Sequence, residues 1–447
     1  MQSFYGLCAI VALGRIASAQ VTPVPVAPRS ERIADTIKLR PLARRGAPED
    51  TVRLTRAQAI AEALAQNPQL DIAREQTAQA RARRVQAVSI PDPTLAASYD
   101  EQSRLFALGA AGSRPVSVGL AVPFPDKFRL QNRIGTSDIR TFESNAHLQQ
   151  QLVAFQTSAA YDSLLVALQH RADIQQGLEL SVDFLRRTKA RYEGGTAAKL
   201  DVIKAQVDVA QAQNDLIATE RDIAAAQASL NRQMGRSISA PIEPADSLDM
   251  PPPLPDSSDI ERAALEQRPE VTIVESQRQG AAATTSLARE YWLPDLTLAV
   301  SHDYSQSGAP VFSTGVALPV PAFFWQHSRG EIAAAAHFER ELAATYRDVR
   351  AQVSQDVRLA YANASTSMRQ VVFIRDELVP AAREAFRIAT TSYSLGGSSA
   401  LEVLDARRTL LDAQSQLAEA LGAANTARAD LARALGDPLQ RSGANRR

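Results

Sequence analysis

Two copies of one pattern, 201 residues apart, make up most of this chain. The copies match most closely where helices are expected to begin and end, which is where local sequence constrains the backbone most. The matched segments are Ala63–Pro68 with Ala264–Pro269, Tyr192–Gly195 with Tyr393–Gly396, Leu200–Ala205 with Leu401–Ala406, and Gly235 with Gly436. Duplication on this scale predicts that each half folds into the same set of elements.

Each half is predicted to contain a short helix, a medium helix, two strands, a very long helix, a tight tip and a return helix. Prolines and glycines mark the boundaries between these elements. The predicted organisation is a Pro/Arg-rich segment at 20–53, repeat 1 at 54–235, a Pro-rich linker at 236–257, repeat 2 at 258–436 and a flexible tail at 437–447. The strands are expected at about 93–123 and 295–321, and the tips at about 191–198 and 393–399.

The predicted helix lengths favour an elongated architecture over a thick globular core. The long helices are expected at about 131–192 and 328–393, the return helices at 198–233 and 399–434, and the medium helices at 69–89 and 269–290. At ~1.5 Å per residue, a long helix spans ~90–100 Å, a return helix ~54 Å and a medium helix ~30 Å. A return helix stacked on a medium helix therefore matches one long helix, as the wall of a hollow cylinder requires.

A heptad repeat in the return helices predicts coiled-coil packing with small residues in one layer. The large positions are Val202, Val209, Leu216, Ile223 and Leu230, and Val403, Leu410, Leu417, Ala424 and Leu431. The small positions are Ala205, Ala212, Thr219 and Ala226, and Ala406, Ala413, Ala420 and Ala427. Ile203, Ala210, Ile217 and Ala224 widen the apolar arc, so the first return helix is expected to have helical neighbours on two sides.

The predicted strands place large apolar residues on one face and small ones on the other. In the segment 312–320, for example, Phe312, Val316 and Leu318 alternate with Ser313 and Gly315. This pattern suits a lipid-facing strand, and a small soluble sheet with one buried face is the alternative. Four aromatic residues near the second strand pair are predicted to form a membrane-interface belt: Trp292, Phe323, Phe324 and Trp325.

The first 19 residues resemble a secretory signal peptide. An apolar stretch from Tyr5 to Leu13 precedes the small residues Ala17-Ser18-Ala19. A buried N-terminal helix is the alternative reading. Cys8, the only cysteine, would leave with the signal. Nowhere do 18 apolar residues occur in succession, so any membrane crossing is expected to use strands.

The composition predicts neither an enzyme nor a nucleic-acid-binding protein. Lys plus Arg equals Asp plus Glu at 49 each, so no net positive field attracts nucleic acid. The five histidines form no HExxH pair, and the glycine pairs lack the residues of a phosphate loop. No GxSxG elbow occurs. We therefore expect no catalytic residues, no bound metal and no cofactor.

These features resemble the TolC family of outer-membrane efflux proteins over about residues 54–436. The most specific matches are the two tips, at 191–206 and 393–406. The resemblance implies a mainly α fold with a membrane β-barrel: long antiparallel helices form a trimeric α-barrel, and each protomer adds four strands to a 12-stranded barrel. It also implies a homotrimer in outer-membrane lipid that reaches into the periplasm and works with a periplasmic adaptor and an inner-membrane pump.

By the same resemblance, Glu402 and Asp405 narrow the periplasmic aperture. The implied adaptor-docking residues are Tyr192, Gly195, Leu200, Tyr393, Gly396 and Leu401. Where several relatives carry arginine two residues after the tip glycine, this chain has Ser398. The first tip pairs Asp201 with Lys204, so it is less acidic than the second.

Other functions stay open on the sequence. A soluble periplasmic coiled-coil scaffold would not need the strand pairs, and a stand-alone porin would lack the long helices. A type I secretion outlet could share the whole architecture. No methionine or histidine track indicates a metal cargo, so the transported substrate is not predicted.

Overall fold

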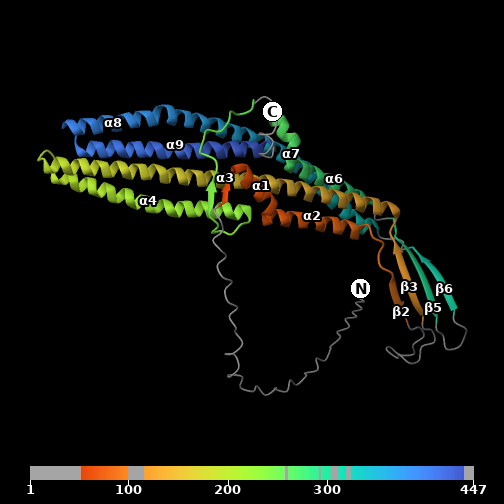
Figure 1. The fold of residues 1–447 in the computed structure, drawn as a ribbon. Coiled ribbons are helices and arrows are strands. Elements are labelled where there is room, and N and C mark those ends of the chain that lie inside the picture. Colours follow the sequence, from red (N-terminus) through yellow and green to blue (C-terminus); the bar gives the residue numbers. More distant parts are fainter. Residues whose placement is uncertain are drawn as a thin grey trace, which may run out of the picture. The chain divides into compact units, whose positions relative to one another are not determined.

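The structure is a computed structural model that describes residues 52–98, 115–256, 260–290, 293–303, 311–318 and 324–436 (Figure 1). The predicted signal peptide at 1–19 and the tail at 437–447 lie outside these residues. Helices in the first half are α1 (Arg56–Gln66), α2 (Pro68–Ala87), α3 (Pro125–Glu193) and α4 (Lys199–Met234). Those in the second half are α5 (Ile260–Gln267), α6 (Pro269–Arg289), α7 (Phe324–Phe373), the π-helical turn η2 (Ile374–Leu378), α8 (Val379–Leu395) and α9 (Ala400–Ala434).

Prolines separate the first two helices of each half. Asn67 and Arg268 have extended backbones, and the next residue is the proline that opens α2 or α6. The N–H groups of the first helical turn have no partner within the helix, so a proline, which lacks an N–H, fits there. Proline also disfavours helical geometry in the residue before it. Asn67 also caps α2, because its side chain accepts a hydrogen bond from the Gln69 N–H at 2.9 Å.

The second long helix differs from the first, because a π-helical turn interrupts it. Helix α3 runs for 69 residues without a break, whereas η2 separates α7 from α8. Pro380 has no N–H with which to continue the helical ladder, and the Val379 N–H instead reaches the carbonyl oxygen of Ile374. The duplicated pattern therefore predicted one continuous helix where the chain has a local distortion.

The four longer strands form one antiparallel sheet, in the order β2 (Thr94–Ala97), β3 (Pro115–Val122), β5 (Leu296–Asp303) and β6 (Val311–Ala317) (Figure 1). Strand β3 of the first half pairs with β5 of the second, so the halves share this sheet. The register aligns Val118 with Val300 and Leu298 with Val316, and these large apolar side chains are exposed. No described residue of the protomer covers this face.

Two further strands were not predicted. Strand β1 (Val52–Leu54) pairs in parallel with β4 (Ile242–Pro244), within segments that we expected to be irregular. Three residues are too few to show alternation in a sequence. Leu54 and Ile242 pack with Tyr161 of α3 and with Leu230 of α4 in one buried cluster, so tertiary contacts stabilise this short pair.

The small-residue layer of the return helices is buried, whereas the second apolar face of α4 is exposed. Ala205 and Ala212 of α4 and Ala413 of α9 are buried, so the small layer lies at helix–helix contacts. Ile203 and Ile217 of α4 are 46% and 67% exposed. The second apolar face of α4 therefore has no partner among the described residues of one protomer.

Helix α3 lies between α4 and α9 and contacts both along much of their length (Figure 1). Glycines allow the close approach of α9. A Cβ atom at Gly177 would come within 2.8 Å of the Leu411 side chain, and one at Gly422 within 2.5 Å of Val166. Among the described residues, no helix is long and apolar enough to cross a membrane.

Candidate functional site

Glycines form both tips, where a long helix turns into its return helix. Gly195 and Gly396 have φ angles of +74° and +85°, which favour glycine over residues with a Cβ atom. Their N–H groups donate to the carbonyl oxygens of Tyr192 and Tyr393, three residues earlier. The following residue donates to the carbonyl of Arg191 or Ser392, and this pair of bonds closes each helix end.

The two tips contact each other through Tyr393. The Arg191 guanidinium of α3 donates to the Tyr393 carbonyl oxygen and lies 4.5 Å from the centroid of its ring. The ring of Phe184 is 5.3 Å from that of Tyr393. Tyr393 is only 5% exposed, so its side chain belongs to the core between the tips and is not accessible to a partner in this conformation.

Other predicted docking residues are accessible. Leu200 and Leu401, in the first turns of the two return helices, are 58% and 60% exposed, and Tyr192 is 45% exposed. A Cβ atom at Gly195 would meet no atom within 4 Å. Large exposed apolar side chains at a chain reversal are typical of an interaction surface.

The two carboxylates predicted at the aperture lie on the first turns of α9. Ser399 caps this helix: its hydroxyl accepts from the Glu402 N–H and donates to the Glu402 carboxylate at 3.2 Å. Glu402 and Asp405 are both exposed, and their spacing of three residues places them on one face of α9. In the first tip, Asp201 and Lys204 occupy the matching positions and are partly buried.

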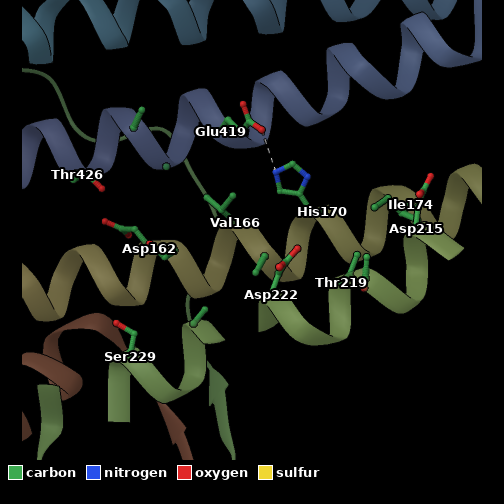
Figure 2. A pocket seen from close by; sticks show the side chains of 16 residues that line it. Asp162, Val166, His170, Ile174, Asp215, Thr219, Asp222, Ser229, Glu419 and Thr426 are labelled. Carbon is green, nitrogen blue, oxygen red and sulfur yellow. Dashed lines mark ion pairs between the residues drawn. The ribbon is translucent and has the colours of Figure 1, made fainter. Parts of the chain in front are cut away.

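A groove runs along α3 between α4 and α9, and sequence reasoning did not find it (Figure 2). One part encloses about 900 Å³ and is lined by Asp162, Asp215, Asp222 and Glu419, with His170 in the middle. His170 is 3.8 Å from the carboxylate of Glu419 and 3.2 Å from the Ser415 hydroxyl. The walls of this groove come from α3 and α4 of the first repeat and from α9 of the second. A motif within one segment of the sequence could therefore not indicate the groove.

Asp162 at the edge of this groove is buried beside the start of α1. Its carboxylate accepts from the Arg56 guanidinium, and its second oxygen is buried without a hydrogen-bond partner. Burial raises the pKa of Asp162 to about 6, although the positive charge of Arg56 opposes the shift; nearby Asp246 adds to it. The Tyr161 hydroxyl donates to the Leu54 carbonyl oxygen, which ties the short sheet to the same part of α3.

Asp162 is expected to make stability depend on pH. Because its folded pKa lies above its ordinary value of 3.8, the stabilisation from its bound proton is complete below that value and is lost as the pH rises through about 6. The raised pKa of Asp162 corresponds to a loss of about 3 kcal/mol in the free energy of unfolding between low and high pH. We expect Asp162→Asn to gain thermal stability relative to the wild type as the pH rises from about 4 through about 6, and to gain little more above about pH 7. A stability difference that does not change with pH would contradict this assignment.

The four predicted membrane-interface aromatics fall at the edges of the described segments. Trp292 and Phe323 lie outside the described residues, and Phe324 and Trp325 form the start of the α7 backbone. Across the described ranges, no group of three or more His, Cys, Asp or Glu side chains is arranged to hold a metal ion.

Comparison with known proteins identifies the family. A sequence model of the family described as "Outer membrane efflux protein" matches residues 59–236 and 261–437, most of both repeats. The cobalt-zinc-cadmium resistance protein CzcC of Cupriavidus metallidurans is 23% identical over 283 residues, which cover 63% of this chain and 67% of CzcC. The pyoverdine export outer membrane protein OpmQ of Pseudomonas aeruginosa is 25% identical over 290 residues, 63% of this chain and 60% of OpmQ.

Solved channel structures share the fold. The outer-membrane channel OprN superimposes with a TM-score of 0.73 at 19% identity, over 87% of this chain and 94% of OprN. The outer membrane protein VceC of Vibrio cholerae gives a TM-score of 0.71 at 22% identity, over 86% of this chain and 96% of VceC.

These findings confirm the predicted fold class and the resemblance to outer-membrane efflux proteins. They also confirm the predicted outer-membrane location and the prediction that the protein is a channel and not an enzyme. Both repeats match one family model, and 86–87% of the chain superimposes on the two solved channels. The chain therefore belongs to the outer membrane efflux protein family.

Proposed function

We propose that three copies of this chain form the exit duct of a tripartite efflux system. In this assembly, a periplasmic adaptor connects the duct to an inner-membrane pump, which supplies the energy. The apolar sheet face carries this proposal: Leu95, Val300, Phe312 and Val316 are between 53% and 75% exposed on one protomer. Burial of such a face in lipid removes its apolar surface from water.

The unpartnered face of α4 supports assembly into a trimer. Ile203, Val207 and Ile217 remain exposed in one protomer, whereas the opposite side of α4 packs on α3. A ring of identical copies covers such a face with a different surface of the next copy. Phe373 and Ile388, which are 62% and 55% exposed on the second long helix, are suitable contacts for it.

We assign the periplasmic aperture to Glu402 and Asp405, and adaptor docking to the accessible tip residues Tyr192, Leu200 and Leu401. The fold and exposure of the tips support this assignment, together with the family membership. Tyr393 is assigned a different role, since its buried ring joins the two tips. Gly195 and Gly396 shape the turns that present the docking residues.

The cargo is proposed to be set by the pump. The names of the two relatives refer to resistance to cobalt, zinc and cadmium in one case and to pyoverdine export in the other, which are chemically unlike substrates. A duct whose relatives serve such different cargoes needs no cargo-specific binding site of its own.

Reconstitution of the purified trimer in planar lipid bilayers tests the duct. We expect discrete conductance steps from the wild type, and in cells that encode an adaptor we expect this adaptor to crosslink to cysteines introduced at Leu200 or Leu401. A cysteine near the other end of the return helix, at Ala225, lies about 37 Å along the axis from Leu200; it is the control and should not crosslink. A soluble monomer without conductance would contradict the proposal.

A further inference from the structure

A buried ion pair joins α9 to α4 just beyond the tips. The guanidinium of Arg407 on α9 donates to the carboxylate of Asp208 on α4, and at 3.4 Å it also donates to the carbonyl oxygen of Gly177 on α3. The side chains of Arg407 and Asp208 are only 10% and 14% exposed. One side chain therefore connects three helices that come from both repeats.

The local packing brings these groups together. Leu411, one turn after Arg407, lies against Gly177, where a Cβ atom would come within 2.8 Å of the leucine side chain. The close approach of α9 to α3 at this glycine lets Arg407 reach the backbone of α3. Helix α4 packs mainly on α3, whereas α9 packs on α3, α7 and α8, and among the described residues no other ion pair joins α4 to α9.

The pair is not optimised for stability alone. The Nε of Arg407 and the second carboxylate oxygen of Asp208 are buried without a hydrogen-bond partner. Each such atom loses its hydration without compensation. A buried ion pair contributes little net stability compared with apolar residues of the same size, but it fixes the register of the elements that it joins.

The position of Arg407 links this register to the carboxylates at the tip. Arg407 follows Asp405 by two residues and Glu402 by five, so the three lie within about 8 Å along the axis of one helix. A second groove part of about 760 Å³ contains Asp405, Lys204, Asp208 and Arg407. Any shift of α9 at Arg407 therefore moves both carboxylates.

We propose that Arg407 is a positioning residue for the aperture, and that its ion pair with Asp208 holds the second tip in register with the first. The pair acts as a clasp: while it is formed, α9 cannot slide or tilt against α3 and α4, and the ring of carboxylates keeps its narrow width. The consequence for transport rests on the proposed duct function, whereas the mechanical role of the clasp does not.

The test uses five variants of the full-length trimer. Arg407→Met removes the charge but keeps the aliphatic stem, and Asp208→Asn keeps the volume. The variant with both changes completes a double-mutant cycle, and Arg407→Asp with Asp208→Arg reverses the pair. Arg387→Met is the matched control, because it removes the same group from an exposed ion pair with Glu384 near the same tip. The measurements are bilayer conductance, block by trivalent lanthanum, and hydrogen–deuterium exchange in the first turns of α4 and α9.

We expect both single variants to raise conductance and to weaken lanthanum block, with a coupling of about tenfold between the two sites in the double-mutant cycle. The reversed pair should restore block toward the wild-type value, which a purely structural defect would not do. Exchange should increase at the tips of the single variants, and Arg387→Met should resemble the wild type in every measurement.

Two outcomes would overturn the clasp. One is unchanged exchange in both single variants, and the other is a combined Arg407→Met and Asp208→Asn variant whose effect on block equals the sum of the two single effects. If the wild type itself does not conduct, the duct proposal fails, and the exchange measurement still decides the clasp. If Arg407→Met does not assemble, the isosteric Asp208→Asn gives the same decision.

Discussion

Glu402→Ala combined with Asp405→Ala is expected to weaken block by multivalent cations at least about tenfold and to reduce cation preference. Three protomers would place six carboxylates around one aperture. A pair of unit charges about 6 Å apart in water attracts by about 0.7 kcal/mol before screening. A tenfold change in affinity corresponds to about 1.4 kcal/mol. A divalent ion among several carboxylates gains more free energy than this. Single-channel recording across a cation titration measures the effect.

The first tip provides the control for this experiment. Asp201→Ala combined with Lys204→Ala removes one charge of each sign from the matching positions of the first copy. Its effect on block should be small, because the two charges largely cancel. Conductance, selectivity and block that stay unchanged in the Glu402/Asp405 variant would show that these residues do not line the constriction.

Ala212→Leu and Ala413→Leu are expected to loosen the trimer strongly. Both alanines are buried, at 7% and 2% exposure, where return helices pack on their neighbours. The added methyl groups must displace a helix, and overpacking of this kind costs about 1–3 kcal/mol in each protomer. All three protomers carry the change, so the altered return helix is displaced in each of them. Thermal dissociation of the trimer, followed on a gel, measures this loss.

Ala423→Leu is the matched substitution at an exposed position of the same return helix as Ala413. It adds the same atoms beside the open groove, where the protomer has no packed neighbour to displace. We expect its trimer to dissociate near the wild-type temperature. Equal loss of stability in Ala413→Leu and Ala423→Leu would contradict the assignment of the small-residue layer to helix contacts.

The main elements could be predicted because local chemistry sets their limits. Pro68 and Pro269 open helices after residues that proline restrains, and Gly195 and Gly396 adopt the positive φ that ends one. The duplication then supplied a second, independent copy of every element. This reasoning missed the π-helical turn before Pro380, because the first copy has no equivalent distortion to compare with it.

The position of Tyr393 could not be predicted from the sequence. As part of a surface motif, Tyr393 was expected to be available for docking. The structure instead packs its ring between Arg191 and Phe184 of the other repeat, which lie about 200 residues earlier in the sequence. The matched residue, Tyr192, is exposed. Equivalent positions in two copies thus differ, because the copies pack against each other asymmetrically.

By itself, the sequence determined the repeated elements, the strand faces and the family, since all of these depend on periodicity and on neighbouring residues. Only the tertiary structure decided which side chains meet across the repeats. Arg407 and Asp208 are 199 residues apart, and each reads locally as an ordinary charge on a return helix. Their burial depends on how closely α9 approaches α3 at Gly177, which is a property of three packed helices and of no segment alone.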